Sequence, residues 1–373
     1  MKIAVPTETV TGENRAAVSV EAVKAYIKKG LEVAVQAGAG AGANIADDDY
    51  KAAGAVIVKG PDVVKNADIV LSVRRPSAAV LKAMKPSAVL VAGLEPYGDR
   101  KGLDALAKSG VTAFAMELMP RISRAQSMDI LSSQANLAGY KAVIDAAAFF
   151  GRAMPMMMTA AGTVPAAKVF IMGVGVAGLQ AIATARRLGA IVSATDVRKA
   201  TEEQVKSLGA KFVFADVADA ATAGGYAKEL SAEDKAKQAK LVADHVKNQD
   251  IVITTALIPG RPAPVLITQE MVESMKPGSV IVDLAVERGG NCPLSKPDQI
   301  VNHKGVSIIG TVNLAGRLAG NATPLFAKNL SNFIETMIGK DGNLAINFDD
   351  ELIKGTMIAQ GGKLVHKMFE DNK

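Results

Sequence analysis

The segment KVFIMGVGVAG, residues 168–178, decides the fold of this chain. Its first five residues form an apolar run typical of a buried strand, and the run AGLQAIATARRLG that follows is typical of a helix. Between strand and helix, Gly173 permits a tight turn, Gly175 lets the backbone approach a pyrophosphate, and Gly178 lets the helix pack closely. The segment therefore predicts a dinucleotide-binding turn between a strand and its helix.

A carboxylate follows the glycines at the spacing of a nucleotide-binding sheet. Asp196 ends the next apolar run, AIVSATD, where a carboxylate can accept hydrogen bonds from the adenosine ribose. Since a 2′-phosphate would meet like charge there, Asp196 predicts NAD rather than NADP. Arg198 argues against this preference for NAD, because an arginine near this position can accommodate NADP.

Apolar runs of strand length alternate with helical segments on both sides of the motif. Those before it are KIAVP, EVAVQ, AVIV, DIVLSV, AVLVAGL and VTAFAMEL, and those after it are KFVFA, DIVITTAL, SVIVDLA and VSIIGTVN. Helices are expected near 18–29 and over 129–150, and a last helix over 318–337 is expected to return to the first domain before a short strand, LAINF. This order predicts an α/β fold of two doubly wound, parallel-sheet, Rossmann-like domains joined by long helices. The first domain is expected over 1–126 and 330–373, and the nucleotide-binding domain over 127–329.

Composition excludes several other classes of protein. The chain has 373 residues, 49% of them hydrophobic and 21% charged, which is typical of a folded protein of two or three domains. Its 43 Lys and Arg against 37 Asp and Glu are spread without a basic block, so no nucleic acid partner is expected. One cysteine and three histidines, in no zinc-binding spacing, predict neither a disulfide nor a metal site. The apolar stretch 153–167 is interrupted by prolines and is too short to cross a bilayer.

Two polar segments remain to be explained. The stretch DVADAATAGGY, residues 216–226, is longer than a strand-to-helix connection needs, and it is either a tolerated insertion or a lid with Tyr226 as its contact residue. In PRISRAQSMDILSSQANLAGY, a helix beginning near Ser127 would place Asp129 and Ser132 on one face. These residues are explained by a solvent-facing helix start, or by a ligand site where two domains meet.

Four long stretches resemble the NAD(H)-binding component of proton-translocating nicotinamide nucleotide transhydrogenase. They are RISRAQSMDILSSQANLAGY, MPMMMTAAGTVPAAKVFIMGVGVAGLQAIATARRLGA, TTALIPGRPAPVLIT and MKPGSVIVDLAVERGGNCP. The resemblance implies direct hydride transfer between NADH and NADP+ bound on a partner component, coupled to proton translocation. It also implies a homodimer that is cytoplasmic and peripheral to the membrane, attached through an NADP(H)-binding component and a membrane proton-channel component.

The resemblance also carries over two sets of site residues. The catalytic set, at the nicotinamide end of NAD(H), is Arg121, Gln126, Asp129 and Ser132, with Gln126 also facing the nucleotide of the partner. The cofactor-binding set is Gly173, Gly175, Val176, Gly178, Asp196, Val197, Arg198, Tyr226, Ala256 and Leu257.

Alanine dehydrogenase is the nearest alternative, because the run GENRAAVS resembles that family too. That enzyme needs a lysine and a histidine, and the matching positions here are Arg74 and Gly93. Arg15, which in that family holds the substrate carboxylate, is present, but it is explained equally well as a structural ion-pair partner. Without an imidazole at the site, oxidative deamination lacks its acid/base group. A non-catalytic NAD-binding module is the remaining alternative.

Overall fold

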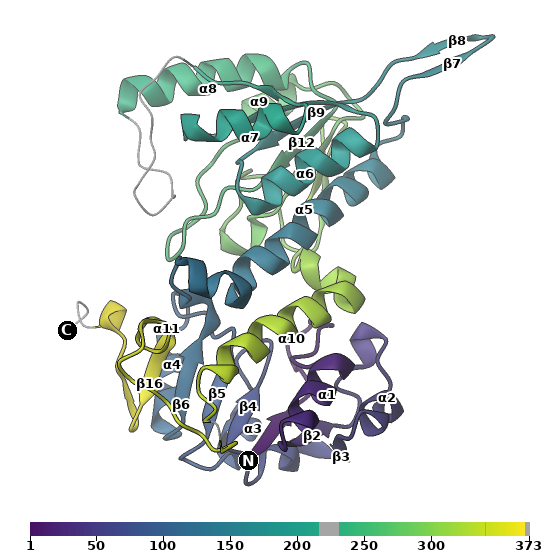
Figure 1. Ribbon diagram of the computed structural model, residues 1–373. Helices are drawn as coiled ribbons and strands as arrows, with labels where there is room; N and C mark the ends of the chain where they lie inside the picture. The colour runs from purple at the N-terminus through teal and green to yellow at the C-terminus, as the bar shows by residue number, and fades with distance from the viewer. Residues whose placement is uncertain (216–230, 340, 370–373) are drawn as a thin grey trace. The chain divides into compact units, whose positions relative to one another are not determined.

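The computed structural model describes residues 1–215, 231–339 and 341–369, which form two compact α/β units (Figure 1). Unit 1 comprises Met1–Gln134 with Ala315–Lys373, and unit 2 comprises Ala135–Leu314. The sequence predicts the two boundaries at residues 126 and 330 instead. In the structure the first boundary lies within α5 (Ile130–Phe149), and the second lies before α10 (Ala319–Glu335), because the apolar side chains of α10 are buried in the core of unit 1.

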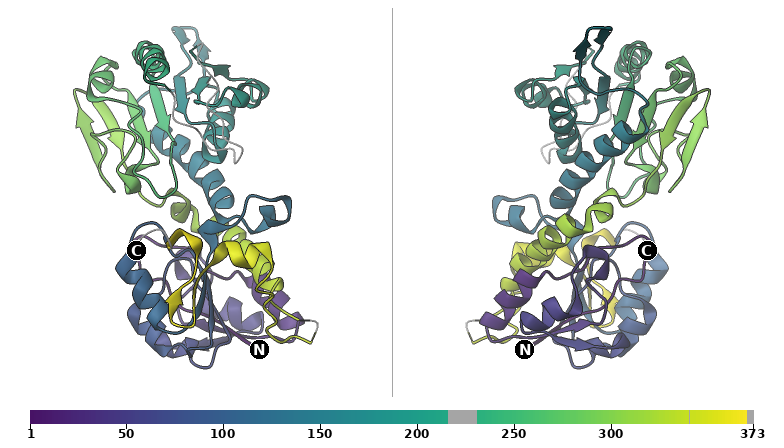
Figure 2. Two further views of the ribbon diagram at one scale, coloured as in Figure 1. Left: turned by 90° about the vertical axis from the view of Figure 1, so that its left-hand side faces the viewer. Right: turned by 90° about the vertical axis from the view of Figure 1, so that its right-hand side faces the viewer.

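Unit 1 is built on an eight-stranded sheet in the order β17-β16-β6-β5-β4-β1-β2-β3. Strands β1 to β6 are parallel, and β16 joins β6 antiparallel, so the C-terminal segment, yellow in Figure 2, completes this sheet. The strands are β1 (Lys2–Val5), β2 (Glu32–Gln36), β3 (Val56–Val58), β4 (Ile69–Leu71), β5 (Val89–Ala92), β6 (Thr112–Ala115), β16 (Met357–Gln360) and β17 (Lys363–Leu364). The helices besides α10 are α1 (Val20–Lys28), α2 (Asp47–Ala52), α3 (Ala78–Ala83), α4 (Arg100–Lys108) and α11 (Glu351–Thr356).

Unit 2 has a seven-stranded sheet in the order β11-β10-β9-β12-β13-β15-β14, parallel except for the edge strand β14. The strands are β9 (Lys168–Met172), β10 (Ile191–Thr195), β11 (Lys211–Phe212), β12 (Ile251–Thr254), β13 (Val280–Asp283), β14 (Ile300–His303) and β15 (Val306–Ile309). The helices are α6 (Val176–Arg187), α7 (Glu202–Ser207), α8 (Ala232–Val246) and α9 (Gln269–Ser274). A separate hairpin is formed by β7 (Met157–Thr159) and β8 (Gly162–Val164).

Both faces of each sheet are covered, which is why the strands are apolar without alternation. In β9, Val169 and Ile171 enter one core with residues of α6, whereas Phe170 and Met172 enter a second core with residues of α8 and α9. Unit 1 likewise has two cores, one on each face. The predicted α/β fold of two Rossmann-like domains is confirmed, as two mixed and mostly parallel sheets.

The end of the chain departs from the expectation. LAINF is not a strand, because only Leu344 forms an isolated bridge, to Ile338. The added strand is instead β16, whose Ile358 and Ala359 are fully buried beside β6. In the part of the chain that the structure describes, no helix has the length and apolar character needed to cross a bilayer.

Candidate functional site

The glycine turn lies between β9 and α6, and each glycine meets a different steric demand. Gly173 has a φ of +103°, a conformation that favours glycine. A Cβ on Gly178 would collide with the carbonyl oxygen of Gly173, so the helix packs directly on the turn. A Cβ on Gly175 would meet no atom within 4 Å. The turn is therefore closed by protein contacts at two glycines and open to a ligand at the third.

Helix α6 starts at this open position. Its N-cap is Gly175, which supplies no side chain to the amides of the first turn, and Val176 exposes 40% of its surface. The first N–H groups of a helix have no partner within the helix and carry partial positive charge. This end of α6 therefore suits a phosphate group.

Asp196 follows β10 and is only 9% exposed. It accepts a hydrogen bond from the backbone N–H of Val174 at 2.7 Å, which ties it to the glycine turn. Arg198 donates to both carboxylate oxygens, from Nε and Nη2, at 2.8 Å. The hydrogen bond to Asp196 raises the pKa of Arg198 above its usual value. The two opposing specificity signals of the sequence therefore form one ion pair, and a ribose at Asp196 must compete with Arg198.

Two further predicted nucleotide contacts follow β12. Ala256 is half-buried, and Leu257 exposes 49% of its surface. The preceding residue, Thr255, donates from its hydroxyl to the carbonyl oxygen of Gly173 at 3.0 Å, so this loop contacts the glycine turn. Val197 is half-buried, while Tyr226 and the expected lid over 216–226 lie outside the described residues.

The four residues of the predicted catalytic set belong to unit 1. Arg121 is exposed, and Gln126 is exposed on the 3-10 helix η4 (Ser123–Met128). Two asparagines of α10, Asn329 and Asn332, donate to the carbonyl oxygen of Ser127 at 2.8 and 3.0 Å. Unit 1 therefore anchors η4 through its backbone and leaves the Gln126 side chain at the surface.

Asp129 and Ser132 contact each other directly. Asp129 accepts hydrogen bonds from the backbone N–H of Ser132 at 3.0 Å and from its hydroxyl at 2.6 Å. Asp129 has an extended backbone, and α5 begins at the next residue, Ile130. The helix expected over 129–150 is therefore present, and it begins at Ile130 rather than near Ser127, because Asp129 supplies the N-cap.

A buried ion-pair cluster surrounds the residues matched to alanine dehydrogenase. Arg15 donates from Nε and Nη2 to the two carboxylate oxygens of Glu13 at 2.7 and 2.6 Å, and Arg74 donates to Glu13 at 2.9 Å. Burial alone would raise the pKa of Glu13, but Arg15 and Arg74 outweigh burial and hold this pKa below its usual value. The guanidinium groups that would meet a substrate carboxylate are thus paired with a carboxylate of the chain itself.

The position matched to the catalytic histidine of that family has no room for a side chain. A Cβ on Gly93 would lie 2.8 Å from the carbonyl oxygen of Val73, closer than Cβ atoms approach such a group. An imidazole at this position would require a shift of the backbone.

In the described part of the chain, no group of three or more His, Cys, Asp and Glu side chains is placed to hold a metal ion. His245, on α8, is half-buried against the sheet. It forms a hydrogen bond with Ser193 Oγ at 2.7 Å and packs edge-on against Phe170, and burial lowers its pKa. Cys292 is fully buried and belongs to a hydrophobic core of unit 2.

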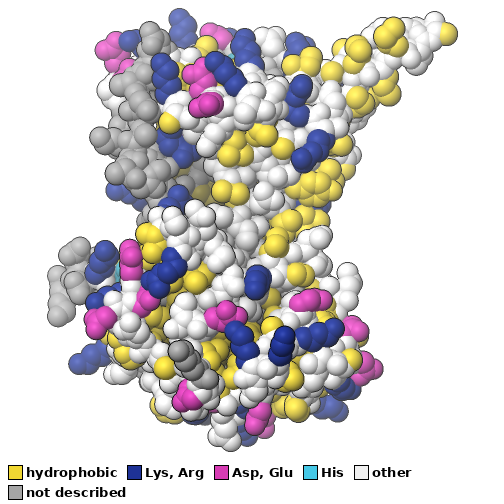
Figure 3. Space-filling view, viewed as in Figure 1, with side chains coloured by type: hydrophobic (Ala, Val, Ile, Leu, Met, Phe, Trp, Pro, Cys, Tyr) yellow, Lys and Arg dark blue, Asp and Glu magenta, His cyan; other side chains and the backbone are white. Residues whose placement is uncertain are grey.

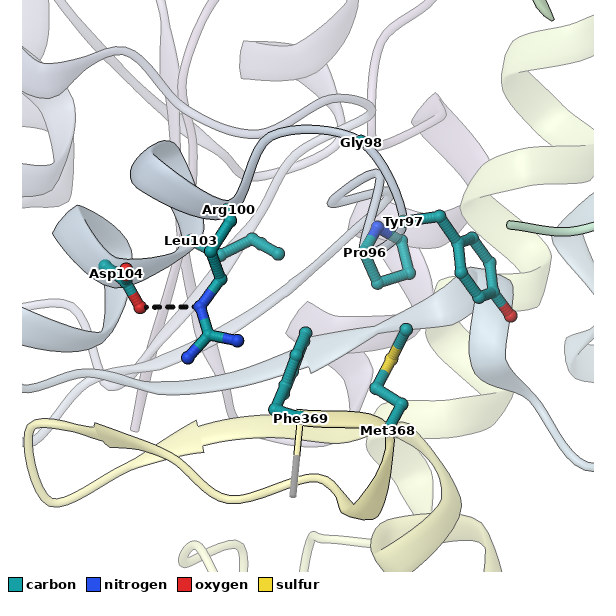
Figure 4. A pocket seen from close by; sticks show the side chains of 8 residues that line it. All are labelled: Pro96, Tyr97, Gly98, Arg100, Leu103, Asp104, Met368 and Phe369. Carbon is teal, nitrogen blue, oxygen red and sulfur yellow. Dashed lines mark hydrogen bonds and ion pairs between the residues drawn. The ribbon is translucent and has the colours of Figure 1, made fainter. Parts of the chain in front are cut away.

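A cavity of about 660 Å³ lies in unit 1 beside the C-terminal segment (Figure 4). Arg100 forms an ion pair with Asp104 at 3.0 Å on one side of it, and the Arg100 guanidinium lies 5.2 Å from the ring centre of Phe369. The residues that line it are Pro96, Tyr97, Gly98, Arg100, Leu103, Asp104, Met368 and Phe369. This cavity therefore does not coincide with either predicted set of site residues.

Sequence reasoning missed three polar residues of unit 2: Thr255, Asp283 and Asn291. Asp283 and Asn291 are fully buried, and all three hydrogen-bond to loops that follow the strands. Their signal in the sequence is weak, because a polar residue just after an apolar run is also typical of a solvated loop.

Comparisons with known proteins agree with this geometry. The family model "Alanine dehydrogenase/PNT, N-terminal domain" matches residues 4–138, and "Alanine dehydrogenase/PNT, C-terminal domain" matches residues 142–367. A polypeptide of the NAD(P) transhydrogenase alpha subunit from Rhodospirillum rubrum is 56% identical over 98% of this chain and 98% of its own.

Two solved structures distinguish the two candidate activities further. A transhydrogenase from Sinorhizobium meliloti matches with a TM-score of 0.91 at 55% identity, covering 98% of this chain and 100% of that chain. An L-alanine dehydrogenase matches with a TM-score of 0.84 at 27% identity, covering 100% of this chain and 98% of that chain. Fold is shared with both, whereas sequence is much closer to the transhydrogenase.

Proposed function

This chain belongs to the alanine dehydrogenase/PNT family, among the alpha-subunit components of NAD(P) transhydrogenase, and we propose that it binds NAD(H) and exchanges a hydride with NADP(H) on a partner component. The observation that carries nucleotide binding is the glycine turn, which is open at Gly175 and faces the uncapped start of α6. In unit 2 this end would hold the pyrophosphate, and Asp196 the adenosine ribose.

The proposed catalytic set would act by positioning. A bound nicotinamide ring supplies or accepts the hydride, so no side chain has to move a proton for the transfer itself. Arg121, Asp129 and Ser132 would orient the ring, and Gln126 would align it with the nucleotide of the partner. The asparagine contacts that anchor η4 support this role, because alignment requires a side chain on a fixed backbone.

We further propose that the chain acts as a homodimer, attached to an NADP(H)-binding component and a membrane proton channel and hence peripheral to the membrane. The β7–β8 hairpin supports association with a second protein surface. Met156, just before β7, exposes 59% of its surface and Met158, within β7, exposes 77%, and Figure 3 shows hydrophobic side chains along the hairpin. Exposed apolar patches of this kind are typical of interaction sites.

Mixing the purified chain with a soluble NADP(H)-binding component tests the function. NADH titration of the chain alone should show binding, and hydride exchange with a nicotinamide analogue should require both proteins. Binding without exchange would favour a non-catalytic module. NADH oxidation by pyruvate and ammonia would favour alanine dehydrogenase. We expect none, because Arg15 is paired with Glu13 and Gly93 leaves no space for an imidazole.

Gln126→Asn tests the positioning role. Since a misplacement of about 1 Å can cost about 100-fold in rate, the shorter side chain should slow single-turnover hydride transfer on that scale and alter NADH affinity little. Asp129→Asn and Arg121→Ala should change both quantities, because those groups would also hold the ring. An unchanged transfer rate in Gln126→Asn would remove Gln126 from the site.

A further inference from the structure

The loop over residues 256–264 joins β12 to the segment before α9, and one buried side chain hydrogen-bonds to both of its ends. Asn291, which follows β13, has no exposed surface. Its Nδ2 donates to the carbonyl oxygens of Ala256 at 2.9 Å and Pro264 at 2.7 Å, and its Oδ1 accepts from the N–H of Ala256 at 3.1 Å. One amide therefore joins the two ends of the loop and uses both of its donor hydrogens.

The backbone of Asn291 holds the same segment. Its carbonyl oxygen accepts from the N–H groups of Leu266 at 2.8 Å and Ile267 at 3.1 Å. The next residue is held in turn, since Asp283 at the end of β13 accepts from the N–H of Cys292 at 3.1 Å and from that of Ala285 at 2.9 Å. Asn291 is therefore tied to the sheet, and it holds both ends of the loop, while the N–H of Ala263 donates to the carbonyl oxygen of Arg288 at 2.8 Å.

This loop lies next to the glycine turn, at the edge of the sheet where the parallel strands end. Thr255, immediately before the loop, donates to the carbonyl oxygen of Gly173. The strand order reverses between β9 and β12, which is where a doubly wound sheet binds its ligand. Because Asp196 follows β10, on the adenosine side of that point, the loop after β12 lies on the nicotinamide side.

We propose that Asn291 is a positioning residue for NAD(H), which shapes the 256–264 loop to receive the nicotinamide half of the nucleotide. This inference rests on the proposed NAD(H) binding. Asn291→Asp keeps the size of the side chain but places a carboxylate against two carbonyl oxygens, so the loop must move. Asn291→Ser retains one hydroxyl donor and should be intermediate.

A second buried amide of unit 2 provides a matched control. Gln249 is 5% exposed and donates to the carbonyl oxygen of His245 at 3.0 Å. It lies just before β12, at the opposite end of that strand from Thr255. Gln249→Ala should therefore lower the melting temperature without changing the 256–264 loop or the glycine turn.

Calorimetric titration of the full chain with NADH and with AMP is the experiment, run beside thermal unfolding. NADH binding should weaken about tenfold or more in Asn291→Asp and less in Asn291→Ser, whereas AMP binding in both and NADH binding in Gln249→Ala should match the wild type. If both Asn291 variants bind NADH as the wild type does, or if Gln249→Ala loses as much affinity, the inference is overturned. Equal weakening of AMP binding would refute the nicotinamide assignment. A wild type that binds no NADH would instead overturn the proposed function itself.

Discussion

In both units the third, second, first, fourth and fifth strands lie side by side in that order, but the first strand is connected to the first helix in different ways. In unit 2 the connection is the short glycine turn between β9 and α6. In unit 1 residues 6–19 connect β1 to α1 and carry three charged side chains into the fold. The same topology thus offers backbone amides to a ligand in one unit and its own side chains in the other.

The side chains of unit 1 occupy the positions that a ligand would use. Glu8 accepts from the N–H groups of Val73 at 2.6 Å and Arg74 at 3.1 Å, just after β4. Glu117 accepts from the N–H groups of Leu94 at 3.0 Å and Glu95 at 2.7 Å, just after β5. Burial raises the pKa of both carboxyl groups. Unit 1 therefore satisfies its strand ends internally, which shows that strand order alone does not create a nucleotide site.

The largest effect is expected from breaking the internal pairing of unit 1. Glu13→Gln leaves the guanidinium groups of Arg15 and Arg74 without their shared carboxylate, which should lower the free energy of unfolding by about 3–5 kcal/mol in urea titrations at pH 7. Asp104→Asn, which breaks the exposed pair with Arg100, should change stability little. Equal urea midpoints for Glu13→Gln and the wild type would show that the ion pairs of Glu13 with Arg15 and Arg74 do not stabilise unit 1.

The pH dependence of this difference follows from the lowered pKa of Glu13. A carboxyl group whose pKa is lowered by folding stabilises the protein above its unfolded pKa, near 4.5, and loses this contribution as the pH falls through the folded value. The stability difference between the wild type and Glu13→Gln should therefore narrow below about pH 4.5.

An intermediate effect is expected at the glycines of unit 2. Gly178→Ala forces a Cβ against the carbonyl oxygen of Gly173 and should lower stability by about 1–3 kcal/mol. Gly175→Ala meets no protein atom, so it should leave the melting temperature unchanged while weakening NADH binding about tenfold, because the new methyl group occupies ligand space. NADH binding as tight as that of the wild type in Gly175→Ala would contradict an open ligand position there.

The smallest effect is expected at the ion pair beside the turn. Arg198→Ala leaves Asp196 without its neutralising partner, so discrimination against NADPH should rise by about tenfold or less, by calorimetry with both nucleotides. Equal affinity of the wild type for NADH and NADPH would contradict the predicted preference and would assign Arg198 to the 2′-phosphate.

Local sequence patterns were sufficient to predict an element where the residues of one short segment determine its structure. The strand, turn and helix over 168–187 form as expected, and α1 (Val20–Lys28) lies within the expected range with Ser19 as its N-cap. They failed where a contact distant in sequence decides the outcome. LAINF has the composition of a strand but no strand to pair with, whereas β16 exists because β6 offers it an edge. The roles of Arg74 and Asn291 likewise depend on Glu13 and on the 256–264 loop, which lie far from them in the sequence.

The sequence by itself determined the parallel strands of the two sheets, the glycine turn, the carboxylate after β10 and the family, because each is expressed in the order and spacing of neighbouring residues. Only the tertiary structure decided which strand ends are open and which are filled. Hydrogen bonds such as those of Glu8 to the residues after β4, or of Asn291 to Ala256, join residues that meet only after the sheet has formed. Because a buried N–H must find an acceptor somewhere, the choice between a side chain of the protein and a ligand is settled by three-dimensional proximity.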